Sequence, residues 1–326
     1  LSARRFPRLY ENPVRTRAAG VHHLLRANCF AMYSFFVLIE EDKFNSQFDL
    51  FKYEVIFSLI IETEGESEVY YRIGQEPGKS SRKSDQKEGV SSMYDENYQV
   101  GSRTSSALAA CLANVYWWMT FALLVSGVTA WAVGTSAELS RMVFQNKGIF
   151  IILILAELGM VFWISAGINK MQASTATALF IAYAVLNGIT LSFIFLAYSM
   201  GSIAMTFAVT AGTFGIMALI GTTTKKDLTS MGNLLFMALI GLIIASIVNW
   251  FWANSTLYWI VTYAGVLIFV GLTAFDAQKI KNMYLAAGTD DSETVRKIAV
   301  LGALTLYLDF INLFLYLLRI FGGRRD

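Results

Sequence analysis

The sequence predicts an all-α, polytopic membrane protein, and three observations lead to this prediction. Hydrophobic residues make up 55% of the 326 residues, charged residues make up 15%, and the mean hydropathy of +0.50 is high for a soluble domain. The charges are concentrated early in the chain: residues 1–100 carry 13 Lys and Arg with 15 Asp and Glu, whereas residues 101–326 carry only 13 and 9. All seven tryptophans follow residue 100. The second part of the chain therefore has the composition of a membrane domain.

Seven apolar runs in this second part are long enough to cross a membrane. A bilayer core of about 30 Å requires about 20 mostly apolar residues in a helix. Tryptophans lie near several of the expected ends, as in the aromatic belts at membrane interfaces (Trp117, Trp118, Trp131, Trp250, Trp252 and Trp259). Seven successive helices with almost no polar face favour membrane spans over soluble core helices. The expected spans are residues 115–133, 149–167, 175–198, 203–221, 234–252, 257–276 and 298–321.

Lysine and arginine in the short connections predict a cytoplasmic N-terminus. If the seventh run crosses completely, eight of these residues lie on the N-terminal side of the membrane and five on the other. The basic tail RIFGGRRD opposes this bias, and a re-entrant last segment would return it to the N-terminal side. We favour seven crossings, although the charge counts are compatible with both arrangements.

Residues 1–92 are expected to be an N-terminal extension, disordered or outside the functional unit. The apolar run RANCFAMYSFFVLI is too short to span a bilayer. The stretch GQEPGKSSRKSDQKEGVSS has the composition of a linker. The basic start of the chain is far from the apolar run, which has no clear cleavage site, so no signal peptide is predicted. The seven-helix domain is therefore placed at residues 93–326.

The sequence contains few of the residue patterns that catalytic sites require. Cys29 and Cys111 are far apart, and both histidines (His22 and His23) precede the membrane part. Such a set provides neither the closely spaced ligands of a zinc site nor a Ser/His/Asp pattern. No Gly-rich phosphate loop is present, and the net charge of +2 gives no indication of nucleic acid. We therefore expect no enzyme, no cofactor and no nucleic-acid partner.

Three carboxylates are expected at membrane depth: Glu157 in the second run, Asp276 at the end of the sixth and Asp309 within the seventh. Ionisable groups at this depth are expensive to keep away from water and usually mark a functional site. Asn187 is also buried and polar, and hydrogen bonding between helices is a better interpretation for it than pore lining. Four glycines within the runs are expected to be close-packing sites (Gly212, Gly215, Gly265 and Gly271).

The two aspartates are related by a predicted helical hairpin. The sixth helix is expected to continue to Gly288, a natural stop, and the next to begin with a capping box of Asp290 and Glu293. In such an antiparallel hairpin, a rise of 1.5 Å per residue places Asp276 and Asp309 within about 10 Å of the same depth. The two side chains can therefore meet.

Two carboxylates that meet in a low dielectric cannot comfortably both ionise, so they share a proton and titrate as a unit. The pair would be a pH-sensitive element, or a cation site when both groups are charged. In the alternative interpretation each aspartate separately caps a helix or pairs with a lysine, such as Lys170 or Lys279, for packing alone.

Several motifs resemble the Bax inhibitor family, also called the transmembrane Bax inhibitor motif family. GLTAFDAQKI and LYLDFINLFLYLLRIFG are similar to the last two helices of that family. INKMQASTATALFIAYAVLNGITLS and GTTTKKDLTSMGN match it further upstream, so the resemblance covers about residues 95–322. The bacterial branch is the most similar. The resemblance implies six helices around a central seventh and a place in a bacterial inner membrane.

The resemblance also implies a function. Family members are described as pH-sensitive calcium leak channels, whose paired aspartates on the last two helices match Asp276 and Asp309. By the same correspondence these aspartates would be tentative calcium contacts, with calcium as the permeant ion. Glu157 resembles an acidic position in the second helix and would contact the cation in the pore. Lys170 lies near the position of the family's basic latch, but at a helix end.

Three functions remain open at this point. The first is the cation leak channel gated by the aspartate pair, which we favour. The second is a regulatory protein that acts through partners, because relatives modulate cell death or contact membrane proteases. The third is a proton-coupled carrier for a small solute. The sequence distinguishes none of these from the others by itself.

Overall fold

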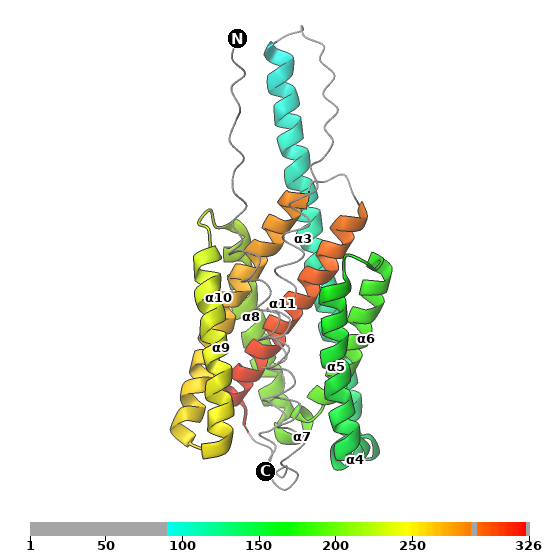
Figure 1. Cartoon of the computed structure of the whole chain (residues 1–326), viewed down its shortest axis with the longest axis vertical. Coiled ribbons are helices and arrows are strands. Elements are labelled where there is room, and N and C mark those ends of the chain that lie inside the picture. The colour runs from blue at the N-terminus through cyan, green and yellow to red at the C-terminus, as the bar shows by residue number, and fades with distance from the viewer. Residues whose placement is uncertain (1–89, 288–291, 324–326) are drawn as a thin grey trace, which may run out of the picture. The chain divides into compact units, whose positions relative to one another are not determined.

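The computed structural model describes residues 90–287 and 292–323, with side chains described from residue 106 onward except at positions 147 and 250. The predicted extension thus lies almost wholly outside the described residues, as do Gly288 and Asp290 of the predicted turn. Every element in the described part is a helix (Figure 1). The helices are α3 (Val90–Thr135), α4 (Ala137–Gln145), α5 (Lys147–Gly167), α6 (Ala173–Leu191), α7 (Ile194–Ala197), α8 (Met200–Thr223), α9 (Thr229–Trp252), α10 (Ser255–Ala287) and α11 (Ser292–Phe321).

Seven segments of the described chain are long and apolar enough to cross a membrane, which confirms the predicted number. Each contains most or all of one predicted run. Their length follows from the near absence of charged residues and of proline, since all three prolines precede residue 78. The segments are Ser106–Thr135, Gly148–Gly167, Ala173–Ala197, Met200–Thr223, Thr229–Asn249, Ser255–Ala287 and Ser292–Phe321.

Two local features were not predicted. The third crossing segment breaks between α6 and α7, where the Ser192 hydroxyl donates to the Ile189 carbonyl oxygen at 2.6 Å and competes with the helical backbone pattern. The connection between the first two crossing segments contains α4, a helix of 9 residues. Ser136 caps α4 by accepting a hydrogen bond from the Leu139 amide.

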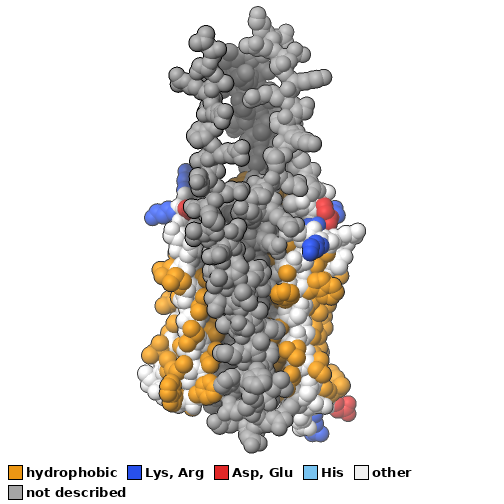
Figure 2. Space-filling view, in the orientation of Figure 1, with side chains coloured by type: hydrophobic (Ala, Val, Ile, Leu, Met, Phe, Trp, Pro, Cys, Tyr) orange, Lys and Arg blue, Asp and Glu red, His pale blue; other side chains and the backbone are white. Residues whose placement is uncertain are grey.

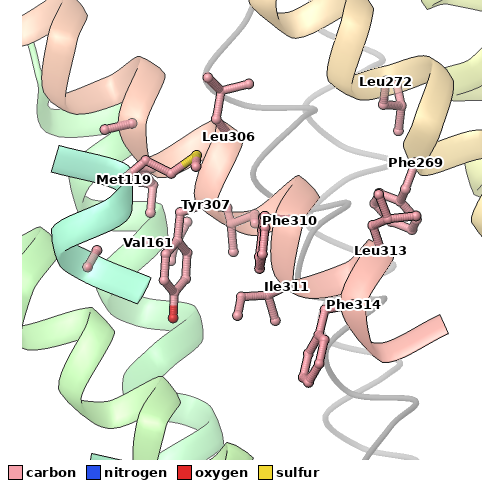
Figure 3. Close-up of a cluster of buried hydrophobic side chains, with 14 of the residues drawn as sticks. Met119, Val161, Phe269, Leu272, Leu306, Tyr307, Phe310, Ile311, Leu313 and Phe314 are labelled. Atoms are coloured by element: carbon pink, nitrogen blue, oxygen red, sulfur yellow. The ribbon is translucent and has the colours of Figure 1, made fainter. Parts of the chain in front are cut away.

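Helix α11 lies at the centre of the bundle. In its most apolar stretch 94% of the residues are buried, against 17% in α9 and 22% in α3 and α8. It packs against α3, α6, α8 and α10 (Figure 1). Figure 3 shows its Tyr307, Phe310 and Phe314 among side chains from the surrounding helices. The central position keeps Asp309 and Asn312 of α11, both buried, away from lipid, where polar side chains are costly.

Helix α11 runs alongside α10 in an antiparallel hairpin. A Cβ atom built at Gly302 would lie 3.0 Å from Ile280, and one built at Gly265 would lie 2.6 Å from the Tyr316 ring. Beyond the far end of α11, the Gly323 amide donates to the Ser202 hydroxyl at 2.9 Å, at the start of α8. The helix is continuous for 30 residues, which is long enough to cross a membrane.

The outward faces of the surrounding helices carry large apolar side chains. Figure 2 shows hydrophobic side chains over the visible sides of the bundle, with lysine, arginine and acidic side chains gathered toward its two ends. Trp117, Ile152 and Leu267 are among the most exposed, at 66%, 66% and 72%. A surface of this kind fits contact with lipid and not with water.

Candidate functional site

Asp276 and Asp309 both lie in the bundle interior, with 1% and 4% of their surfaces exposed. Asp276 projects from α10 and Asp309 from α11. The hairpin register given by Ile280 against Gly302 places the two aspartates about one helical turn apart along the axis, roughly 5 Å. The structure therefore brings these two acidic positions to neighbouring helices at a similar depth.

A basic residue, Lys279, lies beside Asp276. Its Nζ lies 4.0 Å from Oδ1 of Asp276, one helical turn further along α10, and its side chain is 15% exposed. Nζ also lies 5.8 Å from the centre of the Phe275 ring. Lys170, the latch position implied by the resemblance, is exposed in the turn after α5, where its amide donates to the Gly167 carbonyl oxygen at 2.8 Å.

Helices α8 and α9 approach α10 closely around Asp276. Gly221 of α8 faces the backbone of Ala274, so closely that a Cβ atom would collide with the carbonyl oxygen. Gly232 of α9 faces the ring of Phe275 in the same way. Neither approach is possible with a larger residue, and the two glycines hold this turn of α10 against both neighbours.

The loop between α8 and α9 is fastened to α10 by Gln278. Its Nε2 donates to the Lys226 carbonyl oxygen at 2.8 Å, and its Oε1 accepts from the Leu228 amide at 2.8 Å. Lys281 adds a hydrogen bond from Nζ to the Thr222 carbonyl oxygen at 2.8 Å. Gln278 was not identified in the sequence analysis. The feature that could have indicated it is an uncharged polar residue on a helix face whose preceding residues are apolar. The part of α10 that follows Asp276 is therefore hydrogen-bonded both to the α8–α9 loop and to the end of α8.

Within this loop, Asp227 lies two residues before the start of α9. Its Oδ1 accepts hydrogen bonds from the Thr229 amide at 2.9 Å and from the Thr229 hydroxyl at 2.6 Å. These two bonds hold the pKa of the Asp227 carboxyl below its ordinary value. The Asp227 carboxylate is fully exposed. It stabilises the first turn of α9 and takes no part in the buried acidic site.

Glu157 lies in a separate polar network between four helices. Its carboxylate, 4% exposed on α5, accepts a hydrogen bond from the Thr190 hydroxyl at 2.9 Å and another from the Asn187 side chain. Asn187 Oδ1 in turn accepts from the Tyr307 hydroxyl of α11 at 2.8 Å. That hydroxyl also lies 2.7 Å from Ser126 Oγ of α3. Sequence reasoning anticipated Glu157 and Asn187 but missed the three hydroxyls, since Ser, Thr and Tyr are unremarkable in a single helix.

The four glycines expected at close contacts divide into two pairs. A Cβ atom at Gly265 would lie 2.6 Å from Tyr316, and one at Gly271 would lie 2.7 Å from Leu235. The expectation was wrong for Gly212 and Gly215, where a Cβ atom would meet nothing within 4 Å. Gly221, further along α8, makes the close approach of α8 to α10 instead. The helix face that each glycine occupies depends on the packing and not on the local sequence.

Within the described parts of the chain, no three His, Cys, Asp or Glu side chains gather into a metal-binding group. Two carboxylates at similar depth are fewer ligands than the six to eight oxygens of a tight calcium site.

Comparison with known proteins adds the family. Residues 108–326 match the family model described as inhibitor of apoptosis-promoting Bax1. The chain is 53% identical over 220 residues to the inner membrane protein YbhL of Escherichia coli strain K12, which covers 68% of this chain and 94% of that protein. It is 48% identical over 215 residues to an uncharacterized protein of Borreliella burgdorferi, covering 66% of this chain and 92% of that protein. With its central seventh helix and these relatives, the chain belongs to the Bax inhibitor family of membrane proteins.

Proposed function

We propose that this protein is a passive cation leak channel that conducts calcium and is gated by Asp276 and Asp309. The observation that carries the proposal is the burial of two carboxylates on adjacent helices at a similar depth. Buried charges cost free energy, and packing alone would be served better by apolar residues. Retaining two acids on a central helical hairpin therefore indicates that their charge has a use.

The gating mechanism follows from the electrostatics of the pair. Two carboxylates at a similar depth in a low dielectric repel each other when both are charged, so the protonation of one is coupled to that of the other. When both are charged they attract a basic group, and Lys279 is already 4.0 Å from Asp276. Because Lys279 and Asp276 both lie on α10, we expect the closed state to hold α10 against α11 through attraction between Lys279 and the charged Asp309 of α11. Protonation removes that attraction, so cation flux rises at mildly acidic pH.

Glu157 is the second acidic contact on this proposed path. It lies on α5, on the side of the bundle away from α10, and is reached through α6 and α11. A single carboxylate surrounded by hydroxyl and amide groups attracts a cation without trapping it, as conduction requires. We therefore assign it to conduction and not to the pH response.

The proposed setting is a bacterial inner membrane with the N-terminus in the cytoplasm. The relative from Escherichia coli is named as an inner membrane protein. Along the described chain, Lys225 and Lys226 lie exposed in the α8–α9 loop, on the N-terminal side of the membrane in a seven-crossing arrangement. Regulatory contact with a membrane protease or another membrane protein remains a second role for the same domain.

The test is calcium flux into sealed liposomes that contain only this purified protein, measured at about pH 6 and about pH 8 around the titration of the pair. We expect downhill flux that is larger at the lower pH. Protein-free liposomes and the variant carrying both Asp276→Asn and Asp309→Asn are the controls. A complete lack of flux would favour a role through partners, whereas uphill uptake driven by a proton gradient would favour a carrier.

A further inference from the structure

Tyr307 lies at the junction between the central helix and the Glu157 network. It is fully buried, and its ring meets those of Phe180 and Tyr183 of α6 edge-on, each with 5.8 Å between ring centres. Figure 3 shows the Tyr307 ring extending away from α11 on the side of Met119 and Val161. The aromatic contacts fix the ring, so its hydroxyl has a defined position.

The hydroxyl of Tyr307 connects α11 to Glu157 by a short path. It donates to Asn187 Oδ1 at 2.8 Å, and the Asn187 side chain hydrogen-bonds to the Glu157 carboxylate. The Tyr307 hydroxyl also lies 2.7 Å from Ser126 Oγ, and the Ser126 proton has the Ala184 carbonyl oxygen as an acceptor at 2.7 Å. An amide that accepts on one side and donates on the other transmits the position of Tyr307 directly to the carboxylate.

Tyr307 and Asp309 stand on opposite sides of α11. Two residues along an α-helix turn the side-chain direction by about 200°. Tyr307 points toward α3 and α6, where its hydrogen-bond partners lie, so Asp309 points toward the other side of α11. Any rotation or sliding of α11 at Asp309 must therefore move the Tyr307 hydroxyl as well.

We propose that Tyr307 is the positioning residue that ties the Glu157 carboxylate to α11 through Asn187. The inference rests on the proposed function only where it concerns ion flux. The position of the Glu157 side chain depends on its hydrogen bond to Asn187, which is in turn bonded to Tyr307, whether or not the protein conducts ions. Removing the hydroxyl leaves the buried Asn187 Oδ1 without this donor, and the amide is then free to turn away from Glu157. One hydrogen bond of this kind changes an equilibrium about two- to tenfold, which sets the expected change in flux at a fixed pH.

The experiment compares Tyr307→Phe with Ser126→Ala in the full chain. Both substitutions remove one hydroxyl from the same cluster, but only the first breaks the path to Glu157. The measurement is the infrared carboxyl band of Glu157, identified as the band that Glu157→Gln removes, with thermal unfolding in detergent as the measure of stability. We expect the band to shift clearly more in Tyr307→Phe than in Ser126→Ala, because Ser126 contacts the Tyr307 hydroxyl but does not lie on the path to Glu157. An unchanged band in Tyr307→Phe, or equal shifts in both variants, would overturn the inference.

A second measurement covers the case in which Tyr307→Phe does not fold. Replacing Tyr307 by 3,5-difluorotyrosine keeps the hydroxyl and the ring but makes the hydroxyl a stronger donor. We expect the same Glu157 band to move, because the stronger bond to Asn187 changes the amide that contacts the carboxylate. If the band does not respond, Tyr307 does not position Glu157. The infrared result needs no ion flux, so it stands apart from the liposome test of the leak channel.

Discussion

Gly221 of α8 lies directly against the backbone of Ala274 of α10, two residues before Asp276. The contact has no room for a side chain. It places α8 so close to α10 that a Cβ atom on Gly221 would collide with the Ala274 backbone, next to the turn of α10 that carries the buried carboxylate. The position of Asp276 thus depends on a glycine that has no side chain to interact with it.

A first prediction tests this contact with two glycines of the same helix. Gly221→Ala should lower the free energy of unfolding by about 1–3 kcal/mol, because its Cβ atom must displace the Ala274 backbone. Gly212→Ala should be neutral or stabilising by up to about 1 kcal/mol, because the position is exposed and open. Thermal unfolding of both variants in detergent measures the difference. Equal stability of the two would contradict the close approach.

A second prediction concerns Gln278 and the α8–α9 loop. Gln278→Leu should release the loop, because the Lys226 carbonyl and the Leu228 amide each lose their partner. Gln278→Glu should have a smaller effect, because it keeps the acceptor for Leu228. Hydrogen exchange over residues 224–228 should be fastest in the leucine variant and intermediate in the glutamate variant. Exchange rates that match the unchanged protein would mean that the loop is held by other contacts.

A third prediction concerns the two aspartates as a unit. Either Asp276→Asn or Asp309→Asn should abolish most of the pH dependence of calcium flux, because each removes the like-charge repulsion within the pair. The double variant should add little, as expected for groups that titrate together. The measurement is a double-mutant cycle on liposome flux between about pH 6 and about pH 8, across the range in which a shared proton is exchanged. Additive effects would show two separate structural residues.

A fourth prediction separates Glu157 from the pH sensor. Glu157→Gln should reduce cation flux while leaving the midpoint of its pH dependence nearly unchanged, because the carboxylate lies in a different network from the aspartates. The substitution keeps the size of the side chain and an acceptor for the Thr190 hydroxyl. Flux as a function of pH gives both quantities. Normal flux with a large shift of the midpoint would place Glu157 in the sensor.

A fifth prediction concerns the start of the membrane domain. A protein that begins at Met93 should insert and conduct like the full chain, because all seven crossing segments and the family match lie downstream. Yield, thermal unfolding and liposome flux of the two proteins can be compared directly. Loss of folding in the shorter protein would assign residues 1–92 a structural role.

The sequence by itself determined the class of the fold and the positions of its crossing segments. Long apolar runs between short polar connections permit few other structures, because backbone groups in lipid must bond within their own helix. It also singled out Glu157, Asp276 and Asp309, since an ionisable residue in an apolar run is conspicuous without any structure. The hairpin argument placed the two aspartates at similar depth, because rise per residue is fixed by helix geometry.

Only the tertiary structure decided which side chains meet between helices. The rotation of each helix about its axis is set by packing against all its neighbours, and no local pattern in an apolar helix reports it. That is why Gly221 makes the close contact and Gly212 does not, whereas the contact of Lys279 with Asp276 lies within a single turn of α10. It is also why Tyr307 is connected to Glu157, 150 residues earlier in the chain, through Asn187 and hydrogen bonds that only the packed bundle creates.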